Sequence, residues 1–263
     1  MNASEGQIHP TALVAVGARL GRNVSIGAQS IVHPGVEIGD GTVIQEHCSI
    51  GLPGVDAGSP LVIGPGSLIR THSVIYGGSV LGERLETGHH VVIREKTRAG
   101  INLRVGNFCD IEGDCAIGDY SRFHGYAHVG KGSHIGNFVW LFSLTTATND
   151  PLPPSLLNVP VVIEDGAVVC VGVTLMPGVV IGKGAFVSAG SCVRESIPSG
   201  AVVAGLDGHV VNHVSQLLHL PSGLRHPWMR HYRKGYPPEA VARLEKLEKE
   251  ILENRFTLKT ENE

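Results

Sequence analysis

The sequence IHPTALVAVGARLGRNVSIGAQSIVHPGVEIGDGTVIQEHCSI, residues 8–50, carries an aliphatic residue at every sixth position. The residues in this phase are Ile8, Val14, Leu20, Ile26, Val32, Ile38, Ile44 and Ile50. The spacing returns twice further along the chain. The second run is Ile63, Ile69, Ile75, Leu81, Thr87, Ile93, Ala99, Val105, Ile111, Ile117, Phe123, Val129, Ile135, Leu141 and Ala147. The third run is Ile163, Val169, Leu175, Ile181, Val187 and Val193.

A period of six fits neither an amphipathic helix nor an alternating strand, and it is typical of a parallel β-helix built from hexapeptide repeats. In such a fold each hexad is one short strand plus a corner, and three hexads make a triangular coil of about 18 residues. The three runs hold 29 hexads, which predicts an all-β fold of about ten coils, with neighbouring strands about 4.8 Å apart. The repeated aliphatics then point inward, where the neighbouring coils bury them.

Composition agrees with this fold and argues against several partners. The 263 residues include 35 glycines and only 5% aromatics, which favours short strands and tight turns. A formal net charge of -3 gives no reason to expect nucleic acid or an anionic membrane as a partner. The start MNASEGQIHPTAL lacks the pattern of a signal peptide and no run is long enough to span a membrane, so a cytoplasmic protein is expected.

Two interruptions break the period inside the β-helix, which we assign to residues 1–205. They are GLPGVDAGSPLV at 51–62 and TNDPLPPSLLNVPVV at 148–162. We expect loops to leave the prism at these points, and functional residues gather on loops held by a rigid scaffold. The alternative is that the proline-rich insertion is a passive surface loop.

The period ends near residue 203, and residues 206–263 form a C-terminal extension of different character. Pro238 suits the first position of a helix, and an apolar stripe follows at helical spacing, which predicts one amphipathic helix at about 237–255. The stripe is Val241, Leu244, Leu247 and Ile251. This helix either packs on the last coil, contributes to trimer contacts or forms a lid.

Residues 60–205 resemble a known group of enzymes. IEDGAVVCVGVTLMPGVVIGKGAFVSAGSCVRESIPSGAVVAG, at 163–205, resembles the coenzyme A end of left-handed β-helix acyltransferases. TGHHVVIREKTRAGINLRVGNFCDIEGDCAIG, at 87–118, together with ATNDPLPPS, at 147–155, resembles nucleotide-sugar N-acetyltransferases, especially those acting on dTDP-3-amino-3,6-dideoxyhexoses. The resemblance implies a left-handed helix, a homotrimer with active sites between prisms, an acyl-CoA donor and a nucleotide-linked amino sugar as acceptor.

Several residues are candidates for the donor site that this resemblance implies. Gly172 and Gly190 lie 18 residues apart and are expected to stack, leaving a smooth backbone groove for a pantetheine arm. Ala189 is assigned to the same groove, while Lys183 and Arg194 can meet the coenzyme phosphates as cations. The alternatives are that the glycines serve only the corner turns and that the two cations are solvated surface charges.

Histidines and their neighbours supply the candidates for the acceptor side. His72, His90, Phe108 and Tyr126 recur every 18 residues, and such a column either stacks on a base or sugar ring or forms an outward ladder that holds the coils together. Asp110 and His128 share another column one coil apart, where a carboxylate can orient an imidazole and raise its basicity. His124 and His134 have no comparable partner and are interpreted as surface residues.

YAHVGKGSHIGN, residues 126–137, also resembles the NAHIAHDCTVGN pattern of UDP-N-acetylglucosamine O-acyltransferases, in which the second histidine is the catalytic base. Lys131 stands at that position here. A sugar hydroxyl needs a base before it becomes nucleophilic, whereas a neutral amine is already a nucleophile. The departure therefore favours N-acylation over O-acylation.

These observations predict an acyl-CoA-dependent N-acyltransferase, with acetyl-CoA or another acyl-CoA as donor and a dTDP- or UDP-linked amino sugar that attacks the thioester directly. His128, held by Asp110, would position or deprotonate the amine. Asn149 and Asp150, at the root of the second loop, would hold the amine and the sugar ring. Nucleotide or sugar contacts are assigned to His72, His90, Tyr126 and Lys131, and to the pair Arg94 and Glu95 from the VVIRE match, although corner salt bridges would also explain that pair.

Three other functions stay open. One is the O-acyltransferase of UDP-sugars just described. Another is a zinc enzyme resembling the γ-class carbonic anhydrases, which bind zinc between subunits through three histidines, a set that HGYAH at 124–128 imitates only loosely. The last is a non-catalytic sugar-binding scaffold. The preferred interpretation needs no metal.

Overall fold

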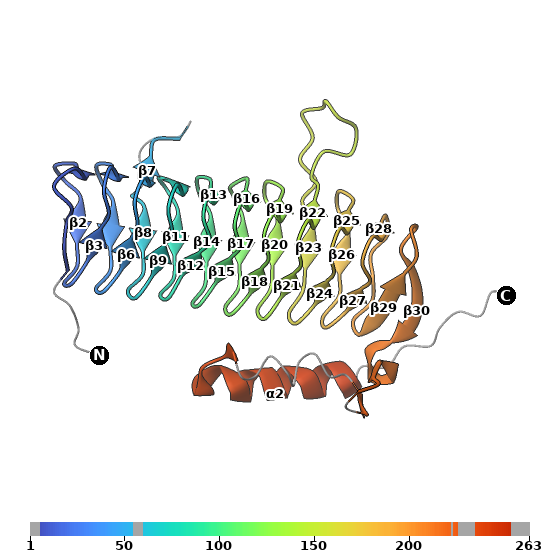
Figure 1. Cartoon of the computed structure of the whole chain (residues 1–263). Helices are drawn as coiled ribbons and strands as arrows, with labels where there is room; N and C mark the ends of the chain where they lie inside the picture. The colour runs from blue at the N-terminus through green and yellow to red at the C-terminus, as the bar shows by residue number, and fades with distance from the viewer. Residues whose placement is uncertain (1–5, 55–59, 222, 226–234, 254–263) are drawn as a thin grey trace, which may run out of the picture.

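The structure is a computed structural model that describes residues 6–54, 60–221, 223–225 and 235–253. Within these residues the chain winds as a triangular prism of short parallel strands (Figure 1). We call its three faces sheet I, sheet II and sheet III in the order in which the chain first enters them. Corner I–II, corner II–III and corner III–I are the turns that join them.

The strands of each sheet come from every third hexad. Sheet I contains β1 (Leu13–Val14), β4 (Ile31–Val32), β7 (Ser49–Leu52), β10 (Val74–Tyr76), β13 (Val92–Ile93), β16 (Asp110–Ile111), β19 (His128–Val129), β22 (Thr146–Ala147), β25 (Thr174–Leu175) and β28 (Cys192–Val193). Sheet II contains β2 (Arg19–Leu20), β5 (Glu37–Ile38), β8 (Val62–Ile63), β11 (Val80–Leu81), β14 (Arg98–Ala99), β17 (Ala116–Ile117), β20 (His134–Ile135), β23 (Val162–Ile163) and β26 (Val180–Ile181). Sheet III contains β3 (Ser25–Ile26), β6 (Val43–Ile44), β9 (Leu68–Ile69), β12 (Glu86–Thr87), β15 (Arg104–Val105), β18 (Arg122–Phe123), β21 (Trp140–Leu141), β24 (Val168–Val169), β27 (Phe186–Val187), β29 (Ala201–Ala204) and β30 (His209–His213).

The repeated aliphatics form the core, as the period of six predicts. Ile50, Ile93 and Val129 are fully buried. Strands one coil apart pair in register, so that Ile111 lies directly over Val129. The residue before each inward aliphatic points outward, and the faces of the prism are therefore columns of residues about 18 apart in sequence.

Two segments leave the prism, and both do so at corner I–II. The first follows β7, and the second joins β22 to β23 and stands well away from the coils (Figure 1). The backbone N–H of Val159 donates to the carbonyl of Asn149 at 2.7 Å, which closes the base of the second loop.

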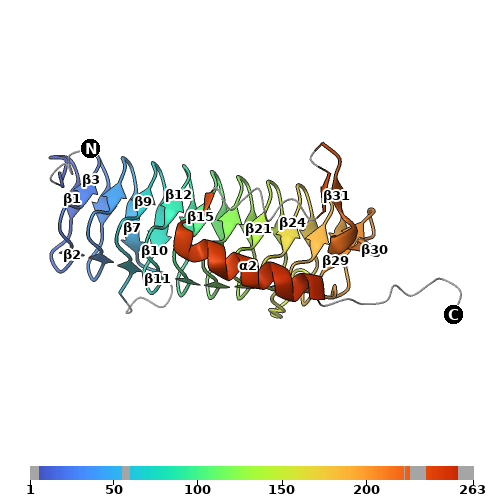
Figure 2. The same cartoon turned by 90° about the horizontal axis from the view of Figure 1, so that it is seen from below.

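The C-terminal residues form an antiparallel addition and one helix. β30 pairs antiparallel with β29, and the 3-10 helix η1 (Val214–Gln216) and the hairpin β31 (Leu218–His219) and β32 (Leu224–Arg225) follow. α2 (Pro238–Glu253) then lies along the prism (Figure 2). The predicted fold class, a left-handed parallel β-helix of about ten coils with a C-terminal helix, is confirmed.

α2 covers corner II–III through both apolar and charged contacts. Leu244 and Ile251 are buried against the prism. Three ion pairs follow the corner from coil to coil. They are Arg84 with Glu239 at 3.2 Å, Arg243 with Asp119 at 2.8 Å, and Lys183 with Glu250 at 3.0 Å. No helix in the described residues has the length and apolar character needed to cross a membrane.

Candidate active site

Sheet I and the two corners that border it carry almost all the residues singled out from the sequence. Asp110 and His128 point outward from β16 and β19 in the middle of the face. Corner I–II carries Arg94, Glu95 and Lys131, with Asn149 and Asp150 where the second loop departs, and it ends with Arg194 after β28. Corner III–I carries His72, His90, Tyr126, Gly172, Ala189 and Gly190.

His128 and Asp110 form a hydrogen-bonded pair across two coils. The Nδ1 of His128 is 3.3 Å from the Oδ2 of Asp110, and the two residues are register partners in sheet I. The hydrogen bond to Asp110 raises the pKa of His128; partial burial opposes this shift, and the charge of Glu112 adds to it. Because Nδ1 faces the carboxylate, Nε2 is the ring nitrogen left for a substrate.

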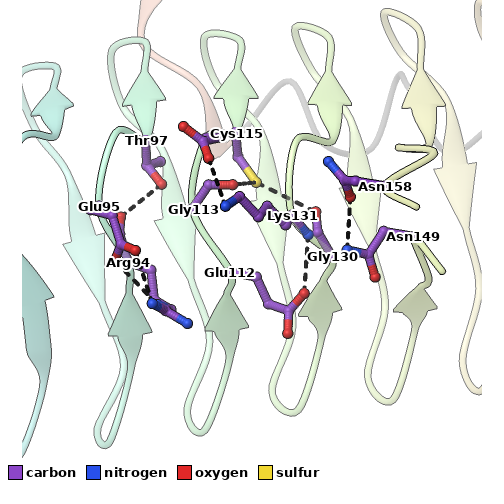
Figure 3. A network of polar contacts seen from close by, with 11 residues as sticks. Arg94, Glu95, Thr97, Glu112, Gly113, Cys115, Gly130, Lys131, Asn149 and Asn158 are labelled. Carbon is purple, nitrogen blue, oxygen red and sulfur yellow. Dashed lines mark hydrogen bonds and ion pairs between the residues drawn. The ribbon is translucent and has the colours of Figure 1, made fainter. Parts of the chain in front are cut away.

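Lys131 is held by carboxylates rather than left as an isolated cation. Its Nζ lies 3.2 Å from the Oδ2 of Asp114, and its backbone N–H donates to the Oε2 of Glu112 at 3.1 Å (Figure 3). An ammonium paired with a carboxylate can donate hydrogen bonds but cannot accept a proton. Lys131 therefore does not replace a histidine base at this position.

Arg94 and Glu95 form a two-pronged ion pair on the same corner. The guanidinium donates from Nη2 to Oε1 at 2.8 Å and from Nε to Oε2 at 3.1 Å (Figure 3). Although burial opposes the shift, hydrogen bonds from the Glu95 backbone and from Arg94 lower the pKa of the Glu95 carboxyl. The guanidinium also lies 5.6 Å from the ring centre of Tyr76. Both side chains thus have partners within the chain, which is the corner salt bridge that the sequence left open.

The second loop holds its two predicted residues differently. Asn149 donates from Nδ2 to the Oδ1 of Asn158 at 2.9 Å, across the base of the loop (Figure 3). Asp150 instead accepts hydrogen bonds within the loop, from Ser155 Oγ at 2.6 Å and from the backbone N–H groups of Ser155 and Leu152. The Ser155 hydroxyl is the main cause of the lowered pKa of Asp150. This geometry gives Asp150 a role in shaping the loop.

The aromatic column at corner III–I is a continuous stack. Ring centres are 4.6 Å apart between His72 and His90, 4.8 Å between His90 and Phe108, and 5.0 Å between Phe108 and Tyr126. His47 extends the stack, 4.8 Å from His72. The sequence analysis missed His47 because the first insertion adds residues between these two coils. Burial and the neighbouring histidines lower the pKa of His72.

The same column changes character toward the C-terminus. Leu144 follows Tyr126 and is 57% exposed, and Gly172 and Gly190 occupy the next two coils. A Cβ atom added at either glycine would meet nothing within 4 Å, so the space filled by rings lower in the column is open here. The glycines have φ values of 67° and 74°, in the left-handed region that Leu144 also adopts.

The residues predicted to bind the coenzyme are not brought together within one chain. Gly172, Ala189 and Gly190 lie on corner III–I, and Arg194 lies on corner I–II. Lys183 lies on corner II–III, where its Nζ pairs with Glu250 of α2 at 3.0 Å. The eighteen-residue spacing places stacked residues correctly, but Lys183 belongs to a different corner from the glycines.

Metal-ligand geometry was also examined in the histidine-rich segment. His124 stacks on Phe142 with ring centres 4.4 Å apart, whereas His134 is exposed on sheet II. In the part of the chain that the structure describes, no three His, Cys, Asp or Glu side chains are grouped so that they could hold a metal ion.

Comparison with known proteins gives matches to acyltransferases. Residues 17–51 match the family described as bacterial transferase hexapeptide (six repeats). Bifunctional protein GlmU of Geobacillus sp. (strain WCH70) is 31% identical over 183 residues, which are 68% of this chain and 37% of that protein. Acyl-(acyl-carrier-protein)–UDP-N-acetylglucosamine O-acyltransferase of Bartonella bacilliformis is 34% identical over 136 residues, which are 51% of this chain and 46% of that protein. The chain thus spans less than half the length of these relatives.

Among solved structures, UDP-N-acetylglucosamine acyltransferase of Arabidopsis superposes with a TM-score of 0.68. It is 22% identical, and the superposition covers 79% of this chain and 74% of that one. At this identity the likeness concerns the fold. Together with the family match and the period of six that runs through the prism, it identifies the chain as a hexapeptide-repeat protein of the left-handed β-helix class.

Proposed function

We propose that the protein transfers an acyl group from an acyl-CoA to the amino group of a nucleotide-linked sugar. The observation that carries the proposal is the pair of His128 and Asp110 on sheet I, between an edge rich in charged groups and an edge with an open glycine groove. A relative named as an acyltransferase of UDP-N-acetylglucosamine supports a nucleotide sugar as acceptor. We include both UDP and dTDP as the nucleotide.

Sheet I supplies a base for the reaction. The neutral amine attacks the thioester carbonyl, and a C–N bond forms as the carbonyl becomes tetrahedral. His128 then takes a proton from the nitrogen through Nε2 while Asp110 stabilises the imidazolium. Collapse of the intermediate breaks the C–S bond, and the thiolate of coenzyme A leaves and is protonated. The products are the amide and free coenzyme A.

The surroundings of Lys131 favour an amine over a hydroxyl as acceptor. Because Lys131 is paired with Asp114, His128 is the base candidate that sheet I offers beside it. A neutral amine reacts without a base, whereas a hydroxyl must lose its proton as it attacks. A site with one base of modestly raised pKa suits the less demanding nucleophile.

O-acyl transfer to a UDP-sugar is the second candidate function. The printed names of the Bartonella and Arabidopsis proteins favour it, and the Bartonella name gives an acyl-carrier protein as the source of the acyl group. A histidine oriented by a carboxylate is also a competent base for a hydroxyl. Donor and acceptor must therefore be tested separately.

Donor binding and assembly are parts of the same proposal. We place the pantetheine arm along Gly172, Ala189 and Gly190, where the column leaves open space. A single chain distributes the cations Lys183 and Arg194 over two other corners, so a homotrimer, in which a neighbouring prism faces sheet I, would complete the site more readily than a monomer. Size-exclusion chromatography with light scattering tests the trimer.

A matched set of substrates tests the function. Purified protein is incubated with acetyl-CoA, a longer acyl-CoA or an acylated carrier protein, and with UDP- and dTDP-sugars that carry either an amine or a hydroxyl at the same ring carbon. Mass spectrometry of the acceptor detects the new acyl group. We expect products from amino sugars and acyl-CoA, and transfer to hydroxyl sugars alone would replace the proposal by the second candidate.

A further inference from the structure

Sheet III carries a hollow of about 460 Å³ that none of the preceding chemistry uses. It lies on a different face of the prism from His128. Its wall includes three arginines, one glutamate and two ring side chains, which are Arg70, Arg104, Arg122, Glu86, His124 and Trp140. This size is within the range of small-molecule sites, which is roughly 300–1,000 Å³.

The charges in the hollow are unbalanced. Glu86, Arg104 and Arg122 are successive members of one outward column on sheet III. Glu86 accepts from Arg70 at 2.7 Å and lies 3.2 Å from the Nε of Arg104. Among the described residues no other carboxylate pairs with these guanidiniums, so the group of four carries two more positive than negative charges.

Arg122 is the buried member of this group. Its side chain has neutral partners, since it donates to the carbonyl and the Oδ1 of Asn102 and to the carbonyl of Ser121, and it lies 4.8 Å from the ring centre of Tyr236. Only 6% of Arg122 is exposed. Burial lowers its pKa to about 10, which leaves the group charged at neutral pH.

Arg104 and Arg122 are also direct register partners on neighbouring strands. Like charges opposite each other in a sheet destabilise it, and burying one of them adds a desolvation cost. An anion lying between the two guanidiniums would remove both costs. Arginine suits phosphate because its planar group presents paired N–H donors.

We propose that this hollow is a second ligand site that binds the phosphate group of a small phosphorylated molecule against Arg104 and Arg122. The hollow is larger than a bare phosphate ion, so the ligand carries a sugar or nucleoside as well. Glu86 limits the affinity by repelling the anion. The inference rests on sheet III alone and does not depend on the acyl transfer proposed for sheet I.

Calorimetric titration with inorganic phosphate, UMP and uridine tests the site, using four proteins. They are the parent, Arg104→Gln, Glu86→Gln and the control Arg98→Gln, which removes an exposed arginine at the equivalent outward position of sheet II. We expect the parent to bind UMP more tightly than phosphate and not to bind uridine. Arg104→Gln should weaken UMP binding at least tenfold, Glu86→Gln should tighten it, and Arg98→Gln should leave it unchanged.

The opposite directions expected for Arg104→Gln and Glu86→Gln separate a ligand site from a structural ladder. Circular dichroism and thermal melting establish that the variants remain folded. The inference is overturned by the absence of saturable binding to the parent, by equal binding of uridine and UMP, by equal effects of Arg104→Gln and Arg98→Gln, or by a failure of Glu86→Gln to tighten binding. A parallel titration of His128→Ala excludes the sheet I site as the source of the signal if its affinity equals that of the parent, and a lost signal there contradicts the inference.

Discussion

His128 and Asp110 occupy the same position in consecutive coils, and the Nδ1 of His128 lies 3.3 Å from the Oδ2 of Asp110. The parallel register of the β-helix holds this distance because both residues are outward members of paired strands. Their hydrogen bond favours the protonated imidazole and raises its pKa. The relationship is thus a property of the scaffold as well as of the two side chains.

Asp110→Asn should lower the pKa of His128, because an amide cannot stabilise the imidazolium as a carboxylate does. NMR titration of the His128 ring measures this directly. In the parent the raised pKa adds stability below the pKa of the unfolded chain, and this stability is lost as pH rises through the folded pKa. The stability of Asp110→Asn should therefore fall less over that range, and identical titrations of His128 in both proteins would exclude the pair as the cause.

His128→Ala should reduce the turnover number by about 100-fold or less, toward the lower end of what a general base contributes. The remaining activity should rise with pH as the substrate amine loses its proton. Steady-state kinetics across pH give both results, and Lys131→Ala, which removes a cation paired with Asp114, should be milder. Complete inactivity of His128→Ala at every pH would show that the base is obligatory.

Asn149→Ala should reduce turnover while the melting temperature and the oligomeric state persist. The Asn149 side chain bonds only to Asn158 in the described structure, at the base of a loop outside the core. Asp150→Ala is the useful comparison because Asp150 bonds to three donors of its own loop. An unfolded Asn149→Ala protein would return this residue to a structural role.

Gly190→Leu should raise the acyl-CoA KM tenfold or more, equivalent to roughly 1.4 kcal/mol, and leave the acceptor KM nearly unchanged. Leucine is chosen because Leu144 adopts the same left-handed backbone in this column, with φ 63°. Gly41→Leu is the control, since Gly41 has a similar φ of 68° and open space at corner II–III. Equal donor constants in the two variants would remove the groove from the donor site.

EDTA should change neither the parent nor the His128→Ala protein, because the proposed reaction moves protons between nitrogen, sulfur and imidazole without a metal. Activity after dialysis against the chelator, with and without added zinc, is the measurement. Activity that is lost in EDTA and restored by zinc would favour a metal enzyme with ligands contributed across subunits.

The sequence was sufficient to predict the β-helix because burial imposes the period of six on every coil. It also placed Asp110 beside His128, since residues 18 apart stack wherever no insertion intervenes. His47 was missed for the same physical reason: the first insertion separates it from His72 by 25 residues, although their rings stack at 4.8 Å.

Contacts that cross from one column to another were harder to predict. Lys131 meets Asp114 and Glu112, which lie 17 and 19 residues away, and side-chain length rather than register decides such pairs. The apolar stripe predicted α2 but not the corner that it covers. That corner is set by Tyr120 and Phe138, which pack in one apolar cluster with the helix. Lys183 was assigned to coenzyme A because its partner on α2 could not be foreseen.

The most direct test of acyl transfer to an amine compares two acceptors that differ in a single atom. The protein is given acetyl-CoA with a nucleotide sugar that carries an amine, or with the same sugar that carries a hydroxyl at that carbon, and the release of free coenzyme A is followed together with the mass of the acceptor. We predict that the amino sugar gains one acetyl group for each coenzyme A released, at a rate that His128→Ala lowers. Acetylation of the hydroxyl sugar at an equal or greater rate, or no transfer to either sugar, would contradict the account.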